Sequence, residues 1–407
     1  MNEGDGLPSP GDALRALLER LSPVGTERVG LRDAVGRVLA EDAATDRPSP
    51  ALSVSAMDGY AVDLSHLRAG WVAVGGEAAI GQPPVTQREG CAARIVTGAP
   101  VPHGATAVLR REDVAERDGW IEIGADLIAR VKEGENIRRE GENGPAGTVF
   151  ARAGCEITPP VAGALAAFGV ASLRVRRRVR VAIVATGDEV VPPEESVEPW
   201  QLRDSNSSAL SAFVAGAAWL ALVSVERCAD EEAPLRAALG RALDGADAVF
   251  VSGGVSMGHR DFVPGVLASL GVERVFHRVA QRPGKPLLGG VGPRGQCVLA
   301  LPGNPVSVMV TARRFGAPTL GRLAGLERFG GPDGAVTLDG EEERAIPLWM
   351  HRLVRLAAPG RAERVPTRGS GDVIGAAGSD GFVEMPPGES GSGPWAYYGW
   401  RLGGGAA

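Results

Sequence analysis

The stretch that decides the fold runs from Asp247 to Asp261 and reads DAVFVSGGVSMGHRD. Its apolar residues 248–251 stand between a polar start and a glycine pair, which is typical of a strand buried on both faces. The chain then turns at the SGG sequence of 252–254, and a helix is predicted to begin near Asp261. Paired glycines after a strand let the backbone bend sharply and approach a ligand closely. Backbone amides at such a turn, together with the N-terminus of a following helix, favour an anion.

Two further buried strands end in the same way. Residues 297–301 run into PGNPVS at 302–307, and residues 179–185 run into TGDE at 186–189. A single SGG turn is more often purely structural, but the carboxyl ends of parallel strands meet at one edge of a sheet. Ligands of open α/β sheets bind beyond that edge. The three strand ends therefore predict one shared ligand-binding edge.

The composition bounds the class of protein. The 407 residues, 44% hydrophobic and 23% charged, indicate a globular protein of two to four domains. A net charge of -6 gives no support to nucleic-acid binding. The four cysteines lie far apart without a CxxC pair, as in a reduced protein without structural zinc. The N-terminus resembles no signal peptide and no apolar run has the length of a membrane span, so we expect a soluble cytoplasmic protein.

Strand and helix patterns divide the chain. Between 178 and 327 they alternate, which predicts a doubly wound, largely parallel α/β sheet. Residues 47–145 instead show short alternating strands with frequent turns, which predict a β domain inserted between 1–46 and 146–177. The end of the chain, 328–407, is again rich in strands and turns. The basic run RVRRRVR at 174–180 is interpreted as a solvated connection rather than a nucleic-acid or membrane site.

A cationic turn and several acids are expected near the ligand edge. The segment RPGKP places Arg282 and Lys285 around a rigid Pro-Gly turn, where both can bind a phosphate-like anion. In isolation such a turn is more often a basic surface loop. It is not a Walker A loop, because no GxxxxGK[ST] occurs.

The acids that follow the strands suggest a metal ion. Asp188, Glu189, Asp230 and Asp261 lie after predicted strands, and carboxylates that face a phosphate typically hold Mg²⁺. Each acid alone could equally cap a helix or lie on the surface. The five histidines form no HExxH pair, and no Cys-His-acid or Ser-His-acid set is present. The residues therefore predict a magnesium-dependent site for a phosphorylated or nucleotide ligand without defining the reaction.

Eight motifs in order give a specific resemblance. They are SAMDGYA (55–61), RIVTGAPVP (94–102), NIRRxGE (136–142), TGDE (186–189), DSN (204–206), SGGVSMG (252–258), PGKP (283–286) and LPGNPVS (301–307). From about residue 10 to 325 the chain resembles the molybdopterin molybdenumtransferases, the family that includes the E domain of gephyrin. Beyond 325 only position and GSGD at 369–372 support the resemblance.

The resemblance implies an architecture and a reaction. It implies a split elongated domain I (1–46 plus 146–177), an inserted β domain II (47–145), a molybdopterin-binding α/β domain III (178–327) and a C-terminal β-barrel domain IV (328–407). It implies a homodimeric enzyme that takes adenylylated molybdopterin and molybdate, hydrolyses the adenylate with Mg²⁺ or Zn²⁺, releases AMP and leaves molybdenum on the pterin.

The family motifs also imply site residues. The resemblance gives catalytic roles to Asp58 and Thr97 from the β domain and to Glu189, Asp261 and Lys285. Glu189, Asp230 and Asp261 would serve the metal. The remaining substrate-binding positions would be Asp230, Ser252, Gly253, Gly254, Ser256, Arg282, Pro302, Gly303, Asn304 and Ser307.

Three departures from the family pattern are present. Asn143 stands where an acid is frequent after NIRRxGE, and Arg282 stands where a lysine is frequent. The C-terminal part is divergent, so Arg352 and Ser370 are only candidate molybdate contacts.

The function also leaves alternatives open. One is the related adenylyltransferase reaction, although those enzymes lack the inserted domain, and another is a non-catalytic pterin-binding scaffold. Tungstate could replace molybdate, and an adenylyltransferase that supplies the substrate is a candidate partner.

Overall fold

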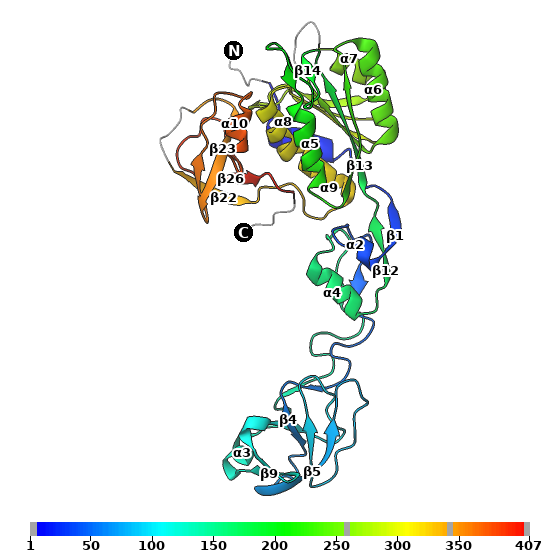
Figure 1. The fold of residues 1–407 in the computed structure, drawn as a ribbon, viewed down its shortest axis with the longest axis vertical. Helices are drawn as coiled ribbons and strands as arrows, with labels where there is room; N and C mark the ends of the chain where they lie inside the picture. The colour runs from blue at the N-terminus through cyan, green and yellow to red at the C-terminus, as the bar shows by residue number, and fades with distance from the viewer. Residues whose placement is uncertain (1–5, 256–260, 340–344, 403–407) are drawn as a thin grey trace. The chain divides into compact units, whose positions relative to one another are not determined.

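The computed structural model describes residues 6–255, 261–339 and 345–402, and the chain forms two compact units (Figure 1). Unit 1 consists of Met1–Glu41, Arg152–Gly163 and Ala171–Ala407, and unit 2 of Asp42–Ala151 and Ala164–Val170. Site residue Ser256 lies outside the described residues. Within the described ranges, none of the helices combines the length and apolar character that crossing a membrane requires.

The centre of unit 1 is a six-stranded sheet in the order β16-β13-β17-β21-β20-β18. The first four strands are parallel, and β20 and β18 continue the sheet antiparallel. This confirms the predicted largely parallel sheet. The strands are β13 (Val179–Thr186), β16 (Leu220–Cys228), β17 (Ala248–Ser252), β18 (Glu273–His277), β20 (Leu288–Val291) and β21 (Cys297–Leu301).

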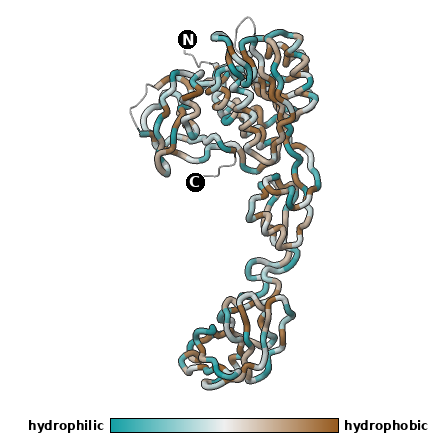
Figure 2. The backbone as a smooth tube through the Cα atoms, viewed as in Figure 1, coloured by the Kyte–Doolittle hydropathy of each residue, from teal (hydrophilic) through white to brown (hydrophobic). Residues whose placement is uncertain are grey.

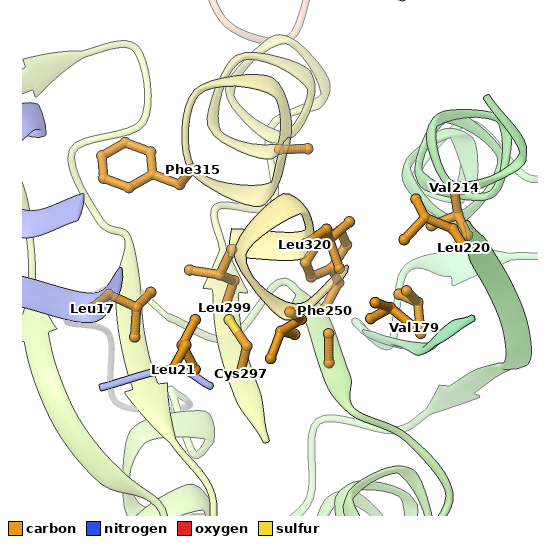
Figure 3. Close-up of a cluster of buried hydrophobic side chains, with 14 of the residues drawn as sticks. Leu17, Leu21, Val179, Val214, Leu220, Phe250, Cys297, Leu299, Phe315 and Leu320 are labelled. Carbon is orange, nitrogen blue, oxygen red and sulfur yellow. The ribbon is translucent and has the colours of Figure 1, made fainter. Parts of the chain in front are cut away.

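Helices cover both faces of this sheet, because successive residues of its strands point to opposite faces and both faces are apolar. Val181 and Ile183 of β13 pack into one buried cluster, whereas Ala182 and Val184 between them pack into another. The first cluster lies under α1, α5, α8 and α9 (Figure 3) and the second under α6 and α7. Figure 2 shows hydrophobic residues, coloured brown, along these central strands. The helices are α1 (Pro10–Leu18), α5 (Ser205–Ala215), α6 (Glu232–Gly245), α7 (Val263–Ser269), α8 (Pro305–Thr311) and α9 (Ala317–Ala324).

Helix α1 belongs to the α/β core. The Oγ of Ser9 caps it by accepting a hydrogen bond of 3.1 Å from the N–H of Asp12. Leu17 is fully buried, in the core cluster that also contains Leu21 and Leu299. Leu17 and Leu21 therefore pack the N-terminal segment against the sheet.

The helical stretch that begins at Pro305 and ends at Ala324 is interrupted. A π-helical segment, Ala312–Gly316, lies between α8 and α9. Pro318 has no N–H to bond the carbonyl of residue 314, which favours a locally wider turn at this point. The segment places Arg313 and Arg314 side by side, and both are buried.

The C-terminal part of unit 1 is a closed five-stranded barrel, as the resemblance implied. The ring runs β23-β24-β22-β26-β25 and closes through the pairing of β25 with β23. Its core contains Val336, Met350, Val354, Ala362 and Val383. The strands are β22 (Gly334–Asp339), β23 (Trp349–Ala358), β24 (Arg361–Arg364), β25 (Gly381–Met385) and β26 (Trp395–Gly399), with α10 (Val373–Ala377) between β24 and β25.

A buried ionic cluster joins this barrel to the π-helical segment. The guanidinium of Arg314 donates to both carboxylate oxygens of Glu384, at 2.6 and 3.2 Å. The Nε2 of His351 lies 3.1 Å from the same carboxylate. Burial would raise the pKa of Glu384, but hydrogen bonds from His351 and Arg314 outweigh it and lower that pKa to about 2. Burial lowers the pKa of His351, so its ring is neutral and Nε2–H donates to the ionised carboxylate.

The basic run predicted as a connection has a structural role. Arg174 and Arg176 lie in β12 (Ser172–Arg176), which pairs antiparallel with β1 (Thr26–Gly30). Arg177 donates to both oxygens of Asp247, at 2.6 and 2.7 Å. The short helices beside this ribbon in the sequence are α2 (Leu31–Ala34) and α4 (Pro159–Ala167).

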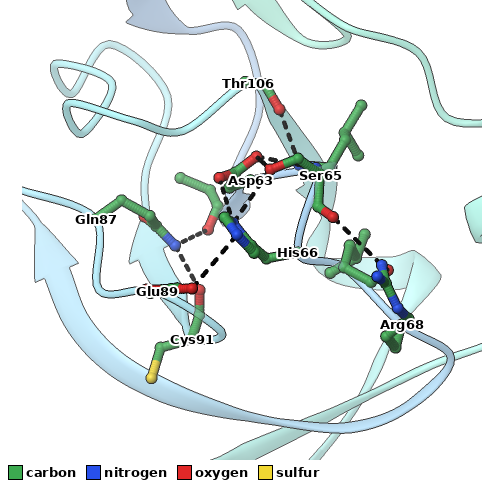
Figure 4. A network of polar contacts seen from close by, with 11 residues as sticks. Asp63, Ser65, His66, Arg68, Gln87, Glu89, Cys91 and Thr106 are labelled. Atoms are coloured by element: carbon green, nitrogen blue, oxygen red, sulfur yellow. Dashed lines mark hydrogen bonds and ion pairs between the residues drawn. The ribbon is translucent and has the colours of Figure 1, made fainter.

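Unit 2 is built on a six-stranded sheet in the order β7-β4-β6-β5-β9-β8. Its strands are β4 (Gly59–Val62), β5 (Gly70–Ala78), β6 (Ala92–Ile95), β7 (Ala107–Arg110), β8 (Ala115–Arg117) and β9 (Trp120–Ile123), with α3 (Ala125–Arg130) after them. A polar network ties two of its loops together (Figure 4). His66 contacts Asp63 through Nδ1 at 2.9 Å and Glu89 through Nε2 at 3.4 Å. Short strand pairs, β3 (Val54–Ser55) with β10 (Ile137–Arg138) and β2 (Ala43–Ala44) with β11 (Val149–Ala151), complete the unit.

Candidate functional site

The three predicted strand ends do meet at one edge of the central sheet. In the parallel register, Ala185 of β13 pairs with Ser252 of β17, and Ser252 pairs with Leu301 of β21. The TGDE, SGG and PGNP turns therefore begin side by side. Because the strands are parallel, all three turns leave the sheet in the same direction.

A cavity of about 770 Å³ opens at this edge, and we call it the acidic cavity. The described residues that line it include nine of the predicted site positions, from all three strand ends and from the loops beyond them. They are Glu189, Asp230, Ser252, Gly253, Gly254, Asp261, Pro302, Gly303 and Asn304. The structure thus brings together the three carboxylates proposed for a metal and most of the proposed substrate-binding residues.

The backbone geometry of the SGG turn requires glycine at positions 253 and 254. Gly253 has a φ of +98°, and a Cβ built on it would lie 2.4 Å from the carbonyl oxygen of Thr186. Gly254 has a φ of +64°, also in the left-handed region. The N–H of Gly253 donates to the carbonyl of Leu301 at 3.3 Å, whereas the N–H of Gly254 makes no hydrogen bond within the described residues. Of these two glycines, it is therefore Gly254 whose N–H can bind a ligand.

Asn206 was not among the predicted site residues, yet it holds two of the turns together. Its Nδ2 donates to the Oγ of Ser252 at 2.9 Å and to the carbonyl of Gly303 at 2.7 Å. Asp204, two residues earlier, caps α5 by accepting from the N–H of Ser207 at 2.8 Å. The DSN motif contained this signal: an N-cap acid followed by an amide that faces the same strand ends.

The carboxylates of the acidic cavity fit a divalent ion that also binds substrate oxygens. The Oγ1 of Thr186 donates to Asp230, and the N–H of Asp230 donates to Asp188 at 3.0 Å, so these acids are held in place. Within the described residues, no three His, Cys, Asp or Glu side chains cluster closely enough to hold a metal alone. Mg²⁺ does not need such a cage, because it keeps waters and takes one or two carboxylates plus phosphate oxygens.

A second cavity, of about 1000 Å³, adjoins the first, and we call it the cationic cavity. Pro286, Pro302 and Asn304 line both cavities. Its described lining contains five cationic side chains and no carboxylate. These are Arg282, Lys285, Arg352, Arg364 and Arg368. Such a concentration of one charge favours an anion.

The cationic cavity combines predicted and unpredicted residues. Arg282, Lys285 and Ser307 were predicted, and Arg352 and Ser370 were only candidates; all line the cavity. Sequence reasoning missed Arg364, the last residue of the barrel strand β24, and Arg368, which follows that strand. The turn that carries Lys285 is fixed by the side chain of buried Gln281, whose Nε2 donates to the carbonyl of Gly284 at 3.0 Å.

The predicted residues of unit 2 form a local pair. Asp58 accepts hydrogen bonds from the N–H and the Oγ1 of Thr97, at 2.7 and 2.8 Å. These two bonds, the backbone one first, lower the pKa of Asp58. Asn143, the departure from the family pattern, donates to the Oγ of Ser49 at 3.0 Å and accepts from Arg138 at 2.6 Å. It therefore has a structural role in its own loop.

Comparisons with known proteins show which family this fold belongs to. The family model described as "MoeA N-terminal region (domain I and II)" matches residues 9–169, and the one described as "Probable molybdopterin binding domain" matches residues 182–322. The fold and the strand-end cavity thus define a protein of the molybdopterin-binding class.

The relatives narrow this class to one family. The molybdopterin molybdenumtransferase of Haemophilus influenzae is 34% identical over 78% of this chain and 78% of its own length. That of Nostoc is 34% identical over 90% of this chain and 86% of its own. The crystal structure of the molybdopterin biosynthesis protein MoeA of Pyrococcus horikoshii superposes with a TM-score of 0.80, at 25% identity, over 97% and 98% of the two chains. The chain belongs to the molybdopterin molybdenumtransferase family, whose members are transferases of molybdenum cofactor biosynthesis.

Proposed function

We propose that this protein inserts molybdenum from molybdate into adenylylated molybdopterin and releases AMP. The observation that carries the proposal is the pair of adjoining cavities at the strand ends, one cationic and one acidic, with Pro286, Pro302 and Asn304 in their common wall. The reaction brings together an oxyanion and a pyrophosphate-linked nucleotide. It therefore needs separate but neighbouring sites for a free dianion and for a phosphate that is bound with a metal.

The cationic cavity is the proposed molybdate site. Molybdate is a compact dianion, and the five cationic side chains of the described lining would bind it electrostatically. Lys285 would act as a point charge, while Arg282 offers a planar guanidinium in place of the family's frequent lysine. The hydroxyls of Ser307 and Ser370, which line the same cavity, can donate hydrogen bonds to oxyanion oxygens.

The acidic cavity is the proposed adenylate site. Glu189, Asp230 and Asp261 would hold Mg²⁺, with Zn²⁺ as the second candidate. When bound, such an ion offsets charge on the pyrophosphate during attack by water. The N–H of Gly254 and the Oγ of Ser252 would orient a phosphate from the opposite side. In the hydrolysis, water adds to the adenylyl phosphorus, the anhydride P–O bond breaks and AMP leaves, so no side-chain nucleophile is needed.

Unit 2 would contribute to the site of a second copy. We infer a homodimer in which the ionised carboxylate of Asp58, oriented by Thr97, enters the partner's cleft. The two hydrogen bonds that Asp58 accepts support this role, because they fix a charged group that is exposed on its own unit. An adenylyltransferase would supply the adenylylated substrate.

The experiment mixes the full chain with adenylylated molybdopterin, Mg²⁺ and molybdate and measures AMP release and pterin-bound molybdenum. Glu189→Gln should lose both activities. Glu194→Gln, an exposed acid that does not line the cavity, is the matched control and should keep them. A parallel reaction with tungstate tests the choice of oxyanion, and one with Zn²⁺ tests the metal.

The outcomes separate this function from its alternatives. Molybdate-dependent AMP release that Glu189→Gln lacks would support insertion and the metal site together. In a separate reaction with ATP and molybdopterin, formation of adenylylated pterin would indicate the adenylyltransferase reaction. Tight binding without turnover would indicate a scaffold, and no binding of the adenylylated pterin would refute the proposal.

A further inference from the structure

The acidic cavity has an apolar rim that the proposed chemistry does not use. Four Val and Leu side chains line it, of which Val255 is buried; the other three, Val190, Leu202 and Val373, are not, and we call these three the apolar rim. Leu202 is 61% exposed and Val373 46% exposed. Single exposed aliphatic residues are common on protein surfaces. Three that line one cavity beside its carboxylates and its glycine turn are a different observation, because a ligand in the cavity can contact all of them.

The rim residues are held by regular backbone structure. Val190 and Leu202 are paired in the parallel register of β14 (Val190–Val191) and β15 (Leu202–Arg203). The N–H of Leu202 donates to the carbonyl of Glu189 at 2.8 Å, which joins the rim to a proposed metal-binding residue. Val373 opens α10, whose N-cap Asp372 accepts from the N–H of Gly375 at 2.9 Å. The side chains are therefore presented at fixed positions although they are exposed.

We propose that Leu202 and Val373 hold the flat face of a heteroaromatic ring of the substrate. The inference rests on the proposed function, because an adenylylated pterin carries two such rings, one at each end of its phosphates. The polar floor of the cavity would bind a phosphate, and the ring next to that phosphate then reaches the rim of the same cavity. Aliphatic side chains packed against the face of a planar ring bury apolar surface of both the ring and the protein. Adenine and pterin share this chemistry, and separate probes distinguish them.

The test measures binding of AMP and, separately, of 6-hydroxymethylpterin to the full chain by isothermal titration calorimetry. Leu202→Ser and Val373→Ser each remove apolar contact and keep a small side chain. Ile374→Ser is the matched control, because Ile374 follows Val373 in α10, is 84% exposed and does not line the cavity. All three positions are exposed, so the substitutions leave the core unchanged.

We expect the Kd of one of the two probes to rise about tenfold in Leu202→Ser and in Val373→Ser, which corresponds to loss of one or two buried methyl groups. Ile374→Ser should match the wild type. In the insertion reaction the same two variants should raise KM and leave kcat unchanged. The affected probe identifies the ring.

Equal Kd values in all four proteins, with the wild type binding a probe, would overturn this inference and leave the proposed function standing. A wild type that binds neither probe would overturn the inference and the proposed adenylate site together.

Discussion

The buried carboxylate of Glu384 should stabilise the barrel and its junction with the α/β core. It lies between the guanidinium of Arg314 and the ring of His351, and its side chain is 8% exposed. Glu384→Gln would keep the size of the side chain but leave the buried charge of Arg314 without a counterion. Removing one partner of such a pair costs about 3–5 kcal/mol.

The lowered pKa of Glu384 gives a second, independent value for the stabilisation that its carboxylate provides. Its decrease from 4.5 to about 2 corresponds to about 3 kcal/mol, at about 1.4 kcal/mol for each tenfold change in proton affinity. Because the pKa is lowered in the folded state, this stabilisation is fully present above pH 4.5. It is lost as the pH falls from 4.5 toward 2, where the folded protein also takes up the proton.

Urea denaturation of the wild type and Glu384→Gln, followed by tryptophan fluorescence between pH 7 and pH 2.5, measures both effects. We expect the free energy of unfolding to differ by about 3 kcal/mol at pH 7 and the difference to shrink steadily below pH 4.5. Glu273→Gln is the control, since this acid pairs with Arg20 on the surface and should change stability very little. A difference below about 1 kcal/mol at pH 7, or one that does not change with pH, would refute the reasoning.

Three further predictions follow from the site. Gly253→Ala should abolish AMP binding and lower the Tm, because its Cβ would lie 2.4 Å from the carbonyl oxygen of Thr186 and its φ is +98°; calorimetry measures both. Lys285→Gln should raise the Kd for molybdate about tenfold at low salt and much less at high salt, as expected for a lost point charge, and titration at two ionic strengths checks this. Thr97→Val removes one of the two hydrogen bonds that lower the pKa of Asp58. It should therefore raise the pKa of Asp58 toward the ordinary value of an aspartate, and an NMR pH titration can follow this change.

The α/β part of the fold was predictable because its signals are local. The apolar run at 248–251 and the SGG sequence after it define both a buried strand and its ligand turn. The helix predicted to begin near Asp261 forms as α7, and Pro264 near its start is consistent with its observed beginning at Val263. The strand-end rule then placed Glu189 and Asp230 at the same edge without any knowledge of their distance.

The π-helical segment and Asn206 were not predictable in this way. The sequence of 305–325 contains a helix period throughout, and only the packing of the barrel shows why two adjacent arginines turn inward. Asn206 acts through hydrogen bonds to Ser252 and Gly303, and these partners are 46 and 97 residues away in the chain. A contact of that kind depends on the finished sheet and leaves only a short motif in the sequence.

The cationic cavity also depends on contacts between parts of the chain that are far apart in the sequence. Arg282 and Lys285 come from the segment between β18 and β20 of the α/β sheet, whereas Arg352, Arg364 and Arg368 come from the divergent barrel. What aligns the two groups is backbone pairing. In β19 (Gln281–Arg282), Gln281 pairs with Trp349 and Arg282 with Met350 of β23. Pairing of this kind tolerates changes of side chain, so a barrel whose sequence has diverged can still present its arginines opposite Lys285 as long as β23 keeps this register.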